Sequence, residues 1–103
     1  MAARRRERTD LYAEVLEVVR RSPGRARVTR ISYGVGMPVD RLKLLLGQLG
    51  TLGLIARRSG DDGDRYELTA RGREFLDVYW RMRAMLGLLD SDSAPEFEAA
   101  RYT

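Results

Sequence analysis

The polar side chains of a leucine-rich segment, residues 38–52, are the residues of this sequence best suited to binding chemistry. Arg41, Lys43 and Gln48 lie there among leucines that recur at helical spacing. An Arg fork matches the O6 and N7 acceptors of guanine, a Gln amide pairs with adenine, and a Lys neutralises a phosphate. The pattern predicts a helix with a buried leucine face and a face able to contact DNA; an ordinary solvated face is the alternative.

Four more arginines are candidates for phosphate contacts. Arg30 lies on a short predicted helix before the leucine-rich one, where it can clamp a phosphate or form a surface ion pair. Arg57 and Arg58 are neighbours on a predicted strand and must point to opposite faces, so we expect only one of them to face DNA. Arg65 lies across the hairpin from them. The alternative for the hairpin arginines is pairing with the acids of the turn, Asp61, Asp62 and Asp64.

The first half of the chain predicts two helices that lead up to this segment. Thr9 or Asp10 can cap a first amphipathic helix, which ends where Ser, Pro and Gly interrupt the pattern at residues 22–24. A short strand at 26–28 follows. Thr29 then caps a brief helix that stops near Gly34 and Gly36, which have the conformational freedom that a helix end requires.

The second half predicts the leucine-rich helix, a hairpin and a last helix. Pro38 suits the first position of the leucine-rich helix, and Gly53 ends it. Residues 54–58 and 65–68 are typical of two strands joined by an acidic glycine turn, and Thr69 caps a helix through Leu89. The fold class is therefore mainly α with a small β-hairpin, in the order of a winged helix-turn-helix.

Composition excludes several classes of protein. A chain of 103 residues fits one small domain, and no apolar run approaches the roughly 18 residues of a membrane helix. The first residues carry charge with no apolar region behind them, so we expect no signal peptide and a cytoplasmic location. Cys and His are absent, which removes disulfides, most zinc sites and catalysis by imidazole or thiolate. The acidic turn lacks the pattern of a calcium loop, so no metal, cofactor or enzyme activity is predicted.

Charge divides the chain into a basic and an acidic half. Residues 1–30 carry a net charge of +5 and residues 31–58 of +3, whereas residues 59–83 carry −1 and residues 84–103 carry −3. Eighteen of the nineteen basic residues are Arg, which suits phosphate and guanine contacts but can equally reflect a GC-rich genome. The basic half is the expected DNA-facing part. We expect residues 1–8 to form a basic arm, with solvated charge as the alternative. We expect residues 90–103 to form an acidic, loosely ordered tail.

The last predicted helix carries apolar residues at coiled-coil spacing. Steps of four, three, four and three separate its members, which are Phe75, Tyr79, Met82, Leu86 and Leu89. Val78 and Trp80 widen the apolar surface beyond what one small domain covers, which favours a homodimer. The alternative is that Phe75 and Tyr79 pack on their own core and only the later residues face a partner.

Several short motifs resemble those of small archaeal winged helix-turn-helix regulators, a family also found in crenarchaeal viruses and plasmids. The resemblance covers about residues 11–89. Its motifs are a Thr-Arg-Ile-x-Tyr segment, a leucine-rich exit that ends in Gly-Leu-Ile, and a Tyr-x-Leu-Thr-x-x-Gly junction. They are carried by Thr29, Arg30, Ile31, Tyr33, Leu49, Leu52, Gly53, Leu54, Ile55, Tyr66, Leu68, Thr69 and Gly72.

The resemblance implies DNA binding as a homodimer, with the leucine-rich helix in the major groove and the last helix pairing with its twin. Two features depart from the family: the turn before the recognition helix is Val-Gly-Met-Pro, and the wing tip is acidic. Acids at a wing tip repel phosphate, which argues against ordinary insertion of the wing into a minor groove.

Together these patterns predict a sequence-specific, double-stranded DNA-binding transcriptional regulator. Its expected parts are a basic arm (1–8), a DNA-binding domain (9–68), a coiled-coil dimerisation helix (69–89) and an acidic tail (90–103). The alternative is a winged-helix module that binds proteins in a transcription or replication assembly and has little DNA binding of its own.

Overall fold

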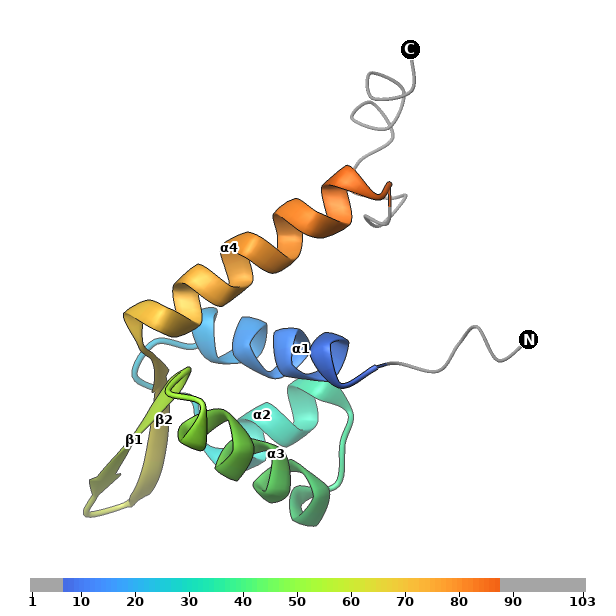
Figure 1. Cartoon of the computed structure of the whole chain (residues 1–103). Helices are drawn as coiled ribbons and strands as arrows, with labels where there is room; N and C mark the ends of the chain where they lie inside the picture. The colour runs from blue at the N-terminus through green and yellow to red at the C-terminus, as the bar shows by residue number, and fades with distance from the viewer. Residues whose placement is uncertain (1–6, 88–103) are drawn as a thin grey trace.

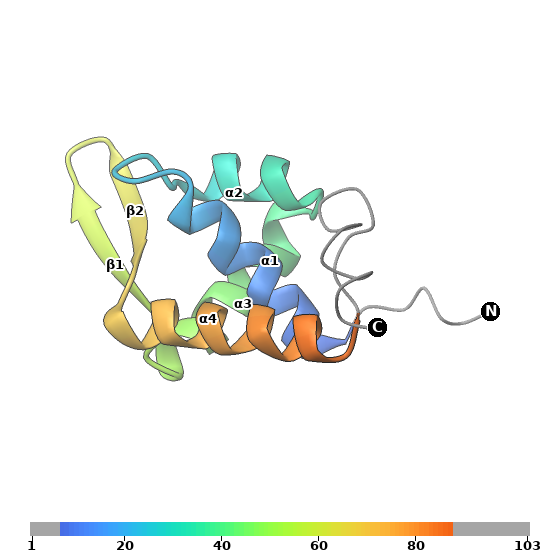
Figure 2. The same cartoon turned by 90° about the horizontal axis from the view of Figure 1, so that it is seen from above.

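The computed structural model describes residues 7–87, which form four helices and one antiparallel hairpin. The elements follow in the order α1 (Arg8–Arg20), α2 (Val28–Val35), α3 (Val39–Thr51), β1 (Ile55–Gly60), β2 (Gly63–Leu68) and α4 (Ala70–Met85). In Figure 1, α1 lies between α4 on one side and α2 with α3 on the other, while the hairpin projects from one end of the helical body. The view from above shows the same order of α4, α1 and α2 (Figure 2). The predicted fold class is confirmed.

The core is formed by apolar side chains from the helices and from the base of the hairpin. Ile31 of α2 and Leu42 and Leu49 of α3 are fully buried with Leu16 of α1. The spacing of the α3 leucines places one face of that helix in the core, because residues three and four apart share a helix face. None of the described helices has the length and apolarity needed to cross a membrane.

The first helix begins earlier than its sequence pattern predicted. Its N-cap is Glu7, and Asp10 acts at the third helical position, where its carboxylate accepts a hydrogen bond from the Glu7 backbone N–H (3.4 Å) in a capping box. The expected cap at Thr9 or Asp10 was therefore wrong, and Arg8 belongs to α1 rather than to an N-terminal arm. Residues 1–6 of the predicted arm lie outside the described residues.

The connection from α1 to α2 forms no strand, although a strand was expected at 26–28. A single hydrogen bond, from the Tyr66 N–H to the Ala26 carbonyl (2.9 Å), ties this segment to β2. The N-cap of α2 is Arg27, two residues before the predicted cap at Thr29, and the helix begins at Val28. One hydrogen bond is too little to add a third strand to the sheet, so residues 26 and 27 stay irregular until α2 begins.

The turn between α2 and α3 is closed by Ser32 and Met37. The Met37 N–H donates to the Ser32 carbonyl (3.0 Å), the Ser32 hydroxyl donates to the Met37 carbonyl, and the Met37 side chain is buried. Gly36, with φ of 68°, supplies the left-handed residue that ends α2. Pro38 is the N-cap of α3 rather than its first residue, and α3 keeps its predicted extent to within one residue.

The hairpin is longer, and α4 shorter, than the sequence predicted. The strands pair from Ile55 with Leu68 to Gly60 with Gly63, so only the residues between those glycines form the turn. Helix α4 ends at Met85, followed by Gly87 with φ of 71°, and not at Leu89, which lies outside the described residues. A left-handed glycine ends the helix sooner than the hydrophobic pattern suggested.

Thr69 caps α4 as predicted and joins it to the exit from α3. Its side-chain oxygen accepts from the Gly72 N–H (2.9 Å) and its hydroxyl donates to the Gly53 carbonyl (2.7 Å), while its own N–H donates to the Leu54 carbonyl (3.2 Å). A Cβ on Gly72 would lie 2.1 Å from the Leu54 carbonyl oxygen. A residue without a side chain is therefore required where α4 begins.

Replacing Gly72 by Ala should lower the free energy of unfolding by about 1–3 kcal/mol, because the added methyl overlaps backbone that cannot move freely. The matched control is Gly47→Ala in α3, where an added Cβ meets nothing within 4 Å. That change should raise stability by up to about 1 kcal/mol through helix propensity. Urea unfolding of both variants at one protein concentration measures the two effects, and equal effects would contradict the junction.

Candidate nucleic-acid interface

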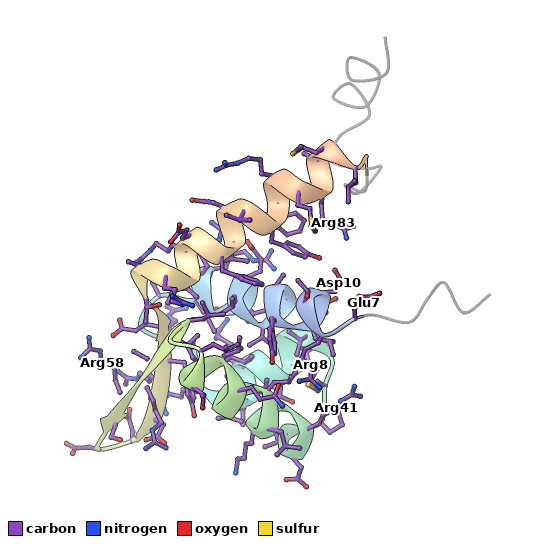
Figure 3. All side chains as sticks on the ribbon, in the orientation of Figure 1. Glu7, Arg8, Asp10, Arg41, Arg58 and Arg83 are labelled. Carbon is purple, nitrogen blue, oxygen red and sulfur yellow. The ribbon has the colours of Figure 1, made fainter. Side chains whose placement is uncertain are left out.

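Helix α3 presents two cations to solvent. Its leucines at 42, 45, 46 and 49 are buried, whereas Arg41 and Lys43 are exposed. Neither forms an ion pair with any residue between 7 and 87. Arg41 lies at the start of α3, at the far end of that helix from the hairpin (Figure 3). Both side chains are free to bind an external anion.

Arg30 on α2 is exposed in the same way and has no ion pair within the described part of the chain. The predicted alternative for Arg30, a surface ion pair, is therefore not found among these residues. A free guanidinium on the helix that precedes α3 retains its full capacity for a bidentate contact with phosphate.

A groove of about 740 Å³ separates α3 from the hairpin. The start of α2 (Val28, Thr29), Lys43 and Gly47 of α3, and Arg57 of β1 line it. The first N–H groups of α2 have no side-chain cap and carry the positive end of the helix dipole. Lys43 and this helix end give the groove a preference for anions, although Asp64 on its rim opposes it.

The hairpin arginines are neutralised within the hairpin. Arg57 pairs with Asp64 (3.6 Å), Arg65 with Asp62 (3.2 Å), and Arg58 with Glu67. In the register of the strands Arg57 lies opposite Tyr66 and Arg58 opposite Arg65, so the two neighbours point to opposite faces as predicted. Arg58 points away from the helices (Figure 3). The predicted alternative of pairing with turn acids is confirmed for Arg57 and Arg65.

Arg27 fixes the tip of the hairpin, a role that sequence reasoning missed. Its guanidinium donates to the Asp62 carboxylate (2.6 Å) and to the Asp62 backbone carbonyl (2.7 Å), across 35 residues of sequence. The Arg27 hydrogen bond, with help from a backbone hydrogen bond and from Arg65, holds the pKa of Asp62 below its ordinary value of 3.8. In the sequence Arg27 lies in the predicted short strand at 26–28, and nothing there distinguishes it from the other arginines of the chain.

Gln48 is held by the core rather than presented to a ligand. Its side-chain oxygen accepts a hydrogen bond from the Tyr12 hydroxyl (2.8 Å), and the residue is half-buried. The amide that was expected to pair with adenine thus has its acceptor already engaged. A tyrosine on α1 determines this, which helical spacing on α3 alone could not reveal.

The residues predicted to form a coiled-coil seam on α4 do not all lie on one exposed face in the structure. Tyr79 is 6% exposed and packs in the core of its own chain, and Phe75 is partly buried against the same core. The predicted alternative, in which Phe75 and Tyr79 pack on their own core, is therefore confirmed for these two residues. Three exposed apolar side chains of α4 and the C-cap residue after it form a neighbouring stripe made of Val78, Met82, Met85 and Leu86, whereas the exposed Trp80 lies off this stripe. Leu89 lies outside the described residues.

Tyr79 binds α4 to α1. Its hydroxyl donates to the Asp10 carboxylate (2.5 Å), and the Arg83 guanidinium lies 3.7 Å from the same carboxylate, so Asp10 and Arg83 face each other (Figure 3). Burial and then the Asp10 hydrogen bond raise the pKa of Tyr79 to about 12. Trp80 adds a hydrogen bond to Glu17 of α1 (3.3 Å). These contacts set the face that α4 turns toward the rest of the described chain.

Comparison with known proteins agrees with this arrangement. A family model described as winged helix-turn-helix matches residues 5–87. The chain belongs to the winged helix-turn-helix family. By their order in the chain, α2 and α3 correspond to the helix-turn-helix pair of this family, with α3 in the place of the recognition helix and the hairpin in the place of the wing. The family is a DNA-binding one and is typically without catalytic activity. Between residues 7 and 87 no group of acidic residues is arranged to hold a metal ion.

Two solved structures resemble this winged helix-turn-helix protein. One is from Pseudomonas aeruginosa PA01 and is provisionally described as a transcriptional regulator; it has 26% identity and a TM-score of 0.62 over 87% of this chain and 67% of that one. The other is Sso10a-2, a DNA-binding protein from Sulfolobus solfataricus, with 23% identity and a TM-score of 0.56 over 72% of this chain and 82% of its own. The second similarity shows the fold alone. No curated protein gives a significant match.

The clamp between Arg27 and Asp62 predicts a specific acid titration. Because the folded-state pKa of Asp62 is lowered, its stabilising effect is complete above the ordinary value of 3.8 and is lost as the pH falls through the folded pKa. In an NMR titration the Asp62 carboxyl should titrate below 3.8. Arg27→Ala should raise that pKa toward the ordinary value.

The control for this titration is Arg25→Ala. Arg25 is an exposed neighbour on the same loop, with no ion pair among the residues described. Its replacement should leave the Asp62 pKa unchanged. An Asp62 pKa that does not respond to the loss of Arg27 would show that the wing tip is not clamped in solution.

Proposed function

We propose that this protein is a sequence-specific, double-stranded DNA-binding transcriptional regulator that acts as a homodimer, with α3 in the major groove. One observation carries the proposal: the exposed face of α3 bears Arg41 and Lys43, which form no ion pair with any residue from 7 to 87, while the wing arginines are neutralised. Unpaired cations on a recognition helix gain most from a polyanion, because no existing ion pair has to be broken. The similarity to a provisionally described transcriptional regulator supports the regulatory role.

Arg41 and Lys43 have different tasks in this proposal. Arg41 is in the first turn of α3, the part of a recognition helix that usually reaches base edges, and its fork suits guanine. Lys43 lines the groove beside the start of α2, where a sugar-phosphate backbone can lie against the helix N-terminus. Arg30 supplies a further phosphate contact from α2.

The wing and Gln48 contribute less to binding than the sequence pattern suggested. Arg57, Arg58 and Arg65 must give up or share carboxylate partners before they can bind phosphate. Gln48 would have to break its hydrogen bond with Tyr12 to pair with adenine. Binding therefore depends on the edge formed by α2 and α3.

Replacing Arg41 by Ala should weaken binding to a selected DNA site by about 1–3 kcal/mol and relax the preference at one base pair. Replacing Lys43 by Ala should weaken binding to all sequences alike and reduce the slope of log K against log salt by about 0.9. Arg81→Ala, an exposed arginine on α4, is the control. Fluorescence anisotropy over a salt series measures both quantities.

A gel-shift assay on genomic fragments at low and moderate salt tests the proposal against the rival role as a protein-binding module. A shift at low salt that weakens steeply at moderate salt is expected. No shift at low salt, with the oligomeric state intact by sizing, would reject DNA binding and favour the rival.

The homodimer in this proposal forms through α4. Val78, Met82 and Met85 are 54%, 42% and 75% exposed, and they follow one another at helical steps of four and three along one stripe. Such spacing is that of a helix that packs lengthwise against another helix. The proposed division of labour is DNA binding by the part up to β2 and dimerisation by α4.

Introducing a charge into the stripe should dissociate the dimer. Met82→Glu should convert the protein from dimer to monomer in sedimentation equilibrium, because two carboxylates would meet across the interface without partners. Asp77→Lys changes charge on another, exposed face of α4 and should leave the dimer intact. A wild-type protein that sediments as a monomer would contradict this part of the proposal and leave DNA binding to be judged by the gel shift.

A further inference from the structure

Leu44 is an exposed apolar side chain at the centre of the proposed DNA-binding face. It is 69% exposed, whereas the other leucines within α3, at 42, 45, 46 and 49, are at most 7% exposed. The fold therefore gains little from a leucine at this position. A single exposed leucine is common on protein surfaces, so its neighbours decide whether it has a role.

The neighbours of Leu44 on α3 form a row that suits close approach by an anionic partner. Arg41 and Gly47 lie three residues before and after Leu44, and such residues share one helix face. An added Cβ on Gly47 would meet nothing within 4 Å, so the fold itself does not require a glycine there. Glycine within a helix costs about 1 kcal/mol of stability relative to alanine. Because glycine has no side chain, it leaves the helix surface beside Leu44 open to close approach.

Charge identifies the kind of partner that covers Leu44. Arg41 lies on its row and Lys43 adjoins it in sequence, and both are unpaired within residues 7–87. An apolar protein surface would leave these cations desolvated without partners, which is costly. Duplex DNA supplies phosphates for the cations and, in the major groove, an apolar group for the leucine: the C5 methyl of thymine.

We infer that Leu44 reads the thymine methyl group, so that a thymine lies opposite the middle of α3 in the preferred site. This inference rests on the proposed DNA binding and adds a specificity determinant to it. Arg41 at the start of the helix and Leu44 one turn later would then contact neighbouring base pairs. Gly47 lets the helix sit close enough for the leucine to touch the methyl group.

Substitution of deoxyuridine for thymine tests the contact, because it removes only the methyl group. A duplex selected for binding is compared with the same duplex in which each thymine in turn is replaced by deoxyuridine. With wild-type protein one position in the half-site should lose about fourfold in affinity, the equivalent of about 0.8 kcal/mol for one buried methyl group. Leu44→Ala should bind the thymine duplex more weakly and show no further loss with deoxyuridine at that position.

Leu52→Ala is the matched control, since Leu52 is an exposed leucine (44%) at the C-cap of the same helix. It should keep the full sensitivity to deoxyuridine, and thermal unfolding of both variants verifies that they are folded. If the wild-type protein binds the selected duplex but no deoxyuridine position matters, or if Leu44→Ala keeps the sensitivity, the inference is overturned while DNA binding stands. If the wild-type protein binds no duplex at low salt, the proposed function fails and the inference fails with it.

Discussion

The junction at Thr69 is the contact on which the rest of the structure depends. There the exit from α3, the start of β1 and the start of α4 meet through hydrogen bonds from Thr69 to the Gly53 and Leu54 carbonyls. Gly72 lets α4 approach the Leu54 carbonyl to a distance that no side chain would permit. One junction thus sets the angle between the recognition helix, the wing and the helix proposed to dimerise. In a dimer the same angle would set the separation of the two recognition helices.

The distribution of charge is a second constraint, and it separates cations that look equivalent in the sequence. A turn of only two residues brings the acids of the wing beside its arginines, and Arg27 adds a clamp from the start of α2. These cations stabilise the wing and are largely neutralised. Arg30, Arg41 and Lys43 form no ion pair with any described residue, so the edge of α2 and α3 keeps positive charge that is not neutralised.

Helix α4 has two contact faces, one packed on the chain's own core and one exposed. Tyr79 and Arg83 turn one face toward Asp10 of α1, and this face packs within the same chain. The adjoining stripe around Met82 has no partner within residues 7–87. A helix with two apolar faces of this kind is consistent with a protein whose monomer is folded but leaves apolar surface for a second chain.

The sequence by itself determined the order of the four helices and the hairpin and the face that α3 buries, but it also suggested a strand at 26–28 that does not form and placed Phe75 and Tyr79 of α4 in a seam rather than in the core. Helical periodicity identified the buried leucines of α3, the glycines at 36 and 53 marked helix ends, and Thr69 was recognisable as a cap. These are local properties, because a helix face or a cap is decided by residues within four positions of each other. Boundaries shifted by one or a few residues where a cap such as Glu7 or a glycine such as Gly87 competed with the apolar pattern.

Only the tertiary structure decided which polar residues remained free. Gln48 is engaged by Tyr12, Asp62 by Arg27 and Tyr79 by Asp10, and these partners are 36, 35 and 69 residues apart in sequence. Spacing along one helix or strand tells which side chains share a face, but it says nothing of what the other elements bring to that face. Ion pairs and buried hydrogen bonds act over a few ångströms in space, so the packing of the whole chain had to be known before the free cations of α3 could be told from the neutralised ones of the wing.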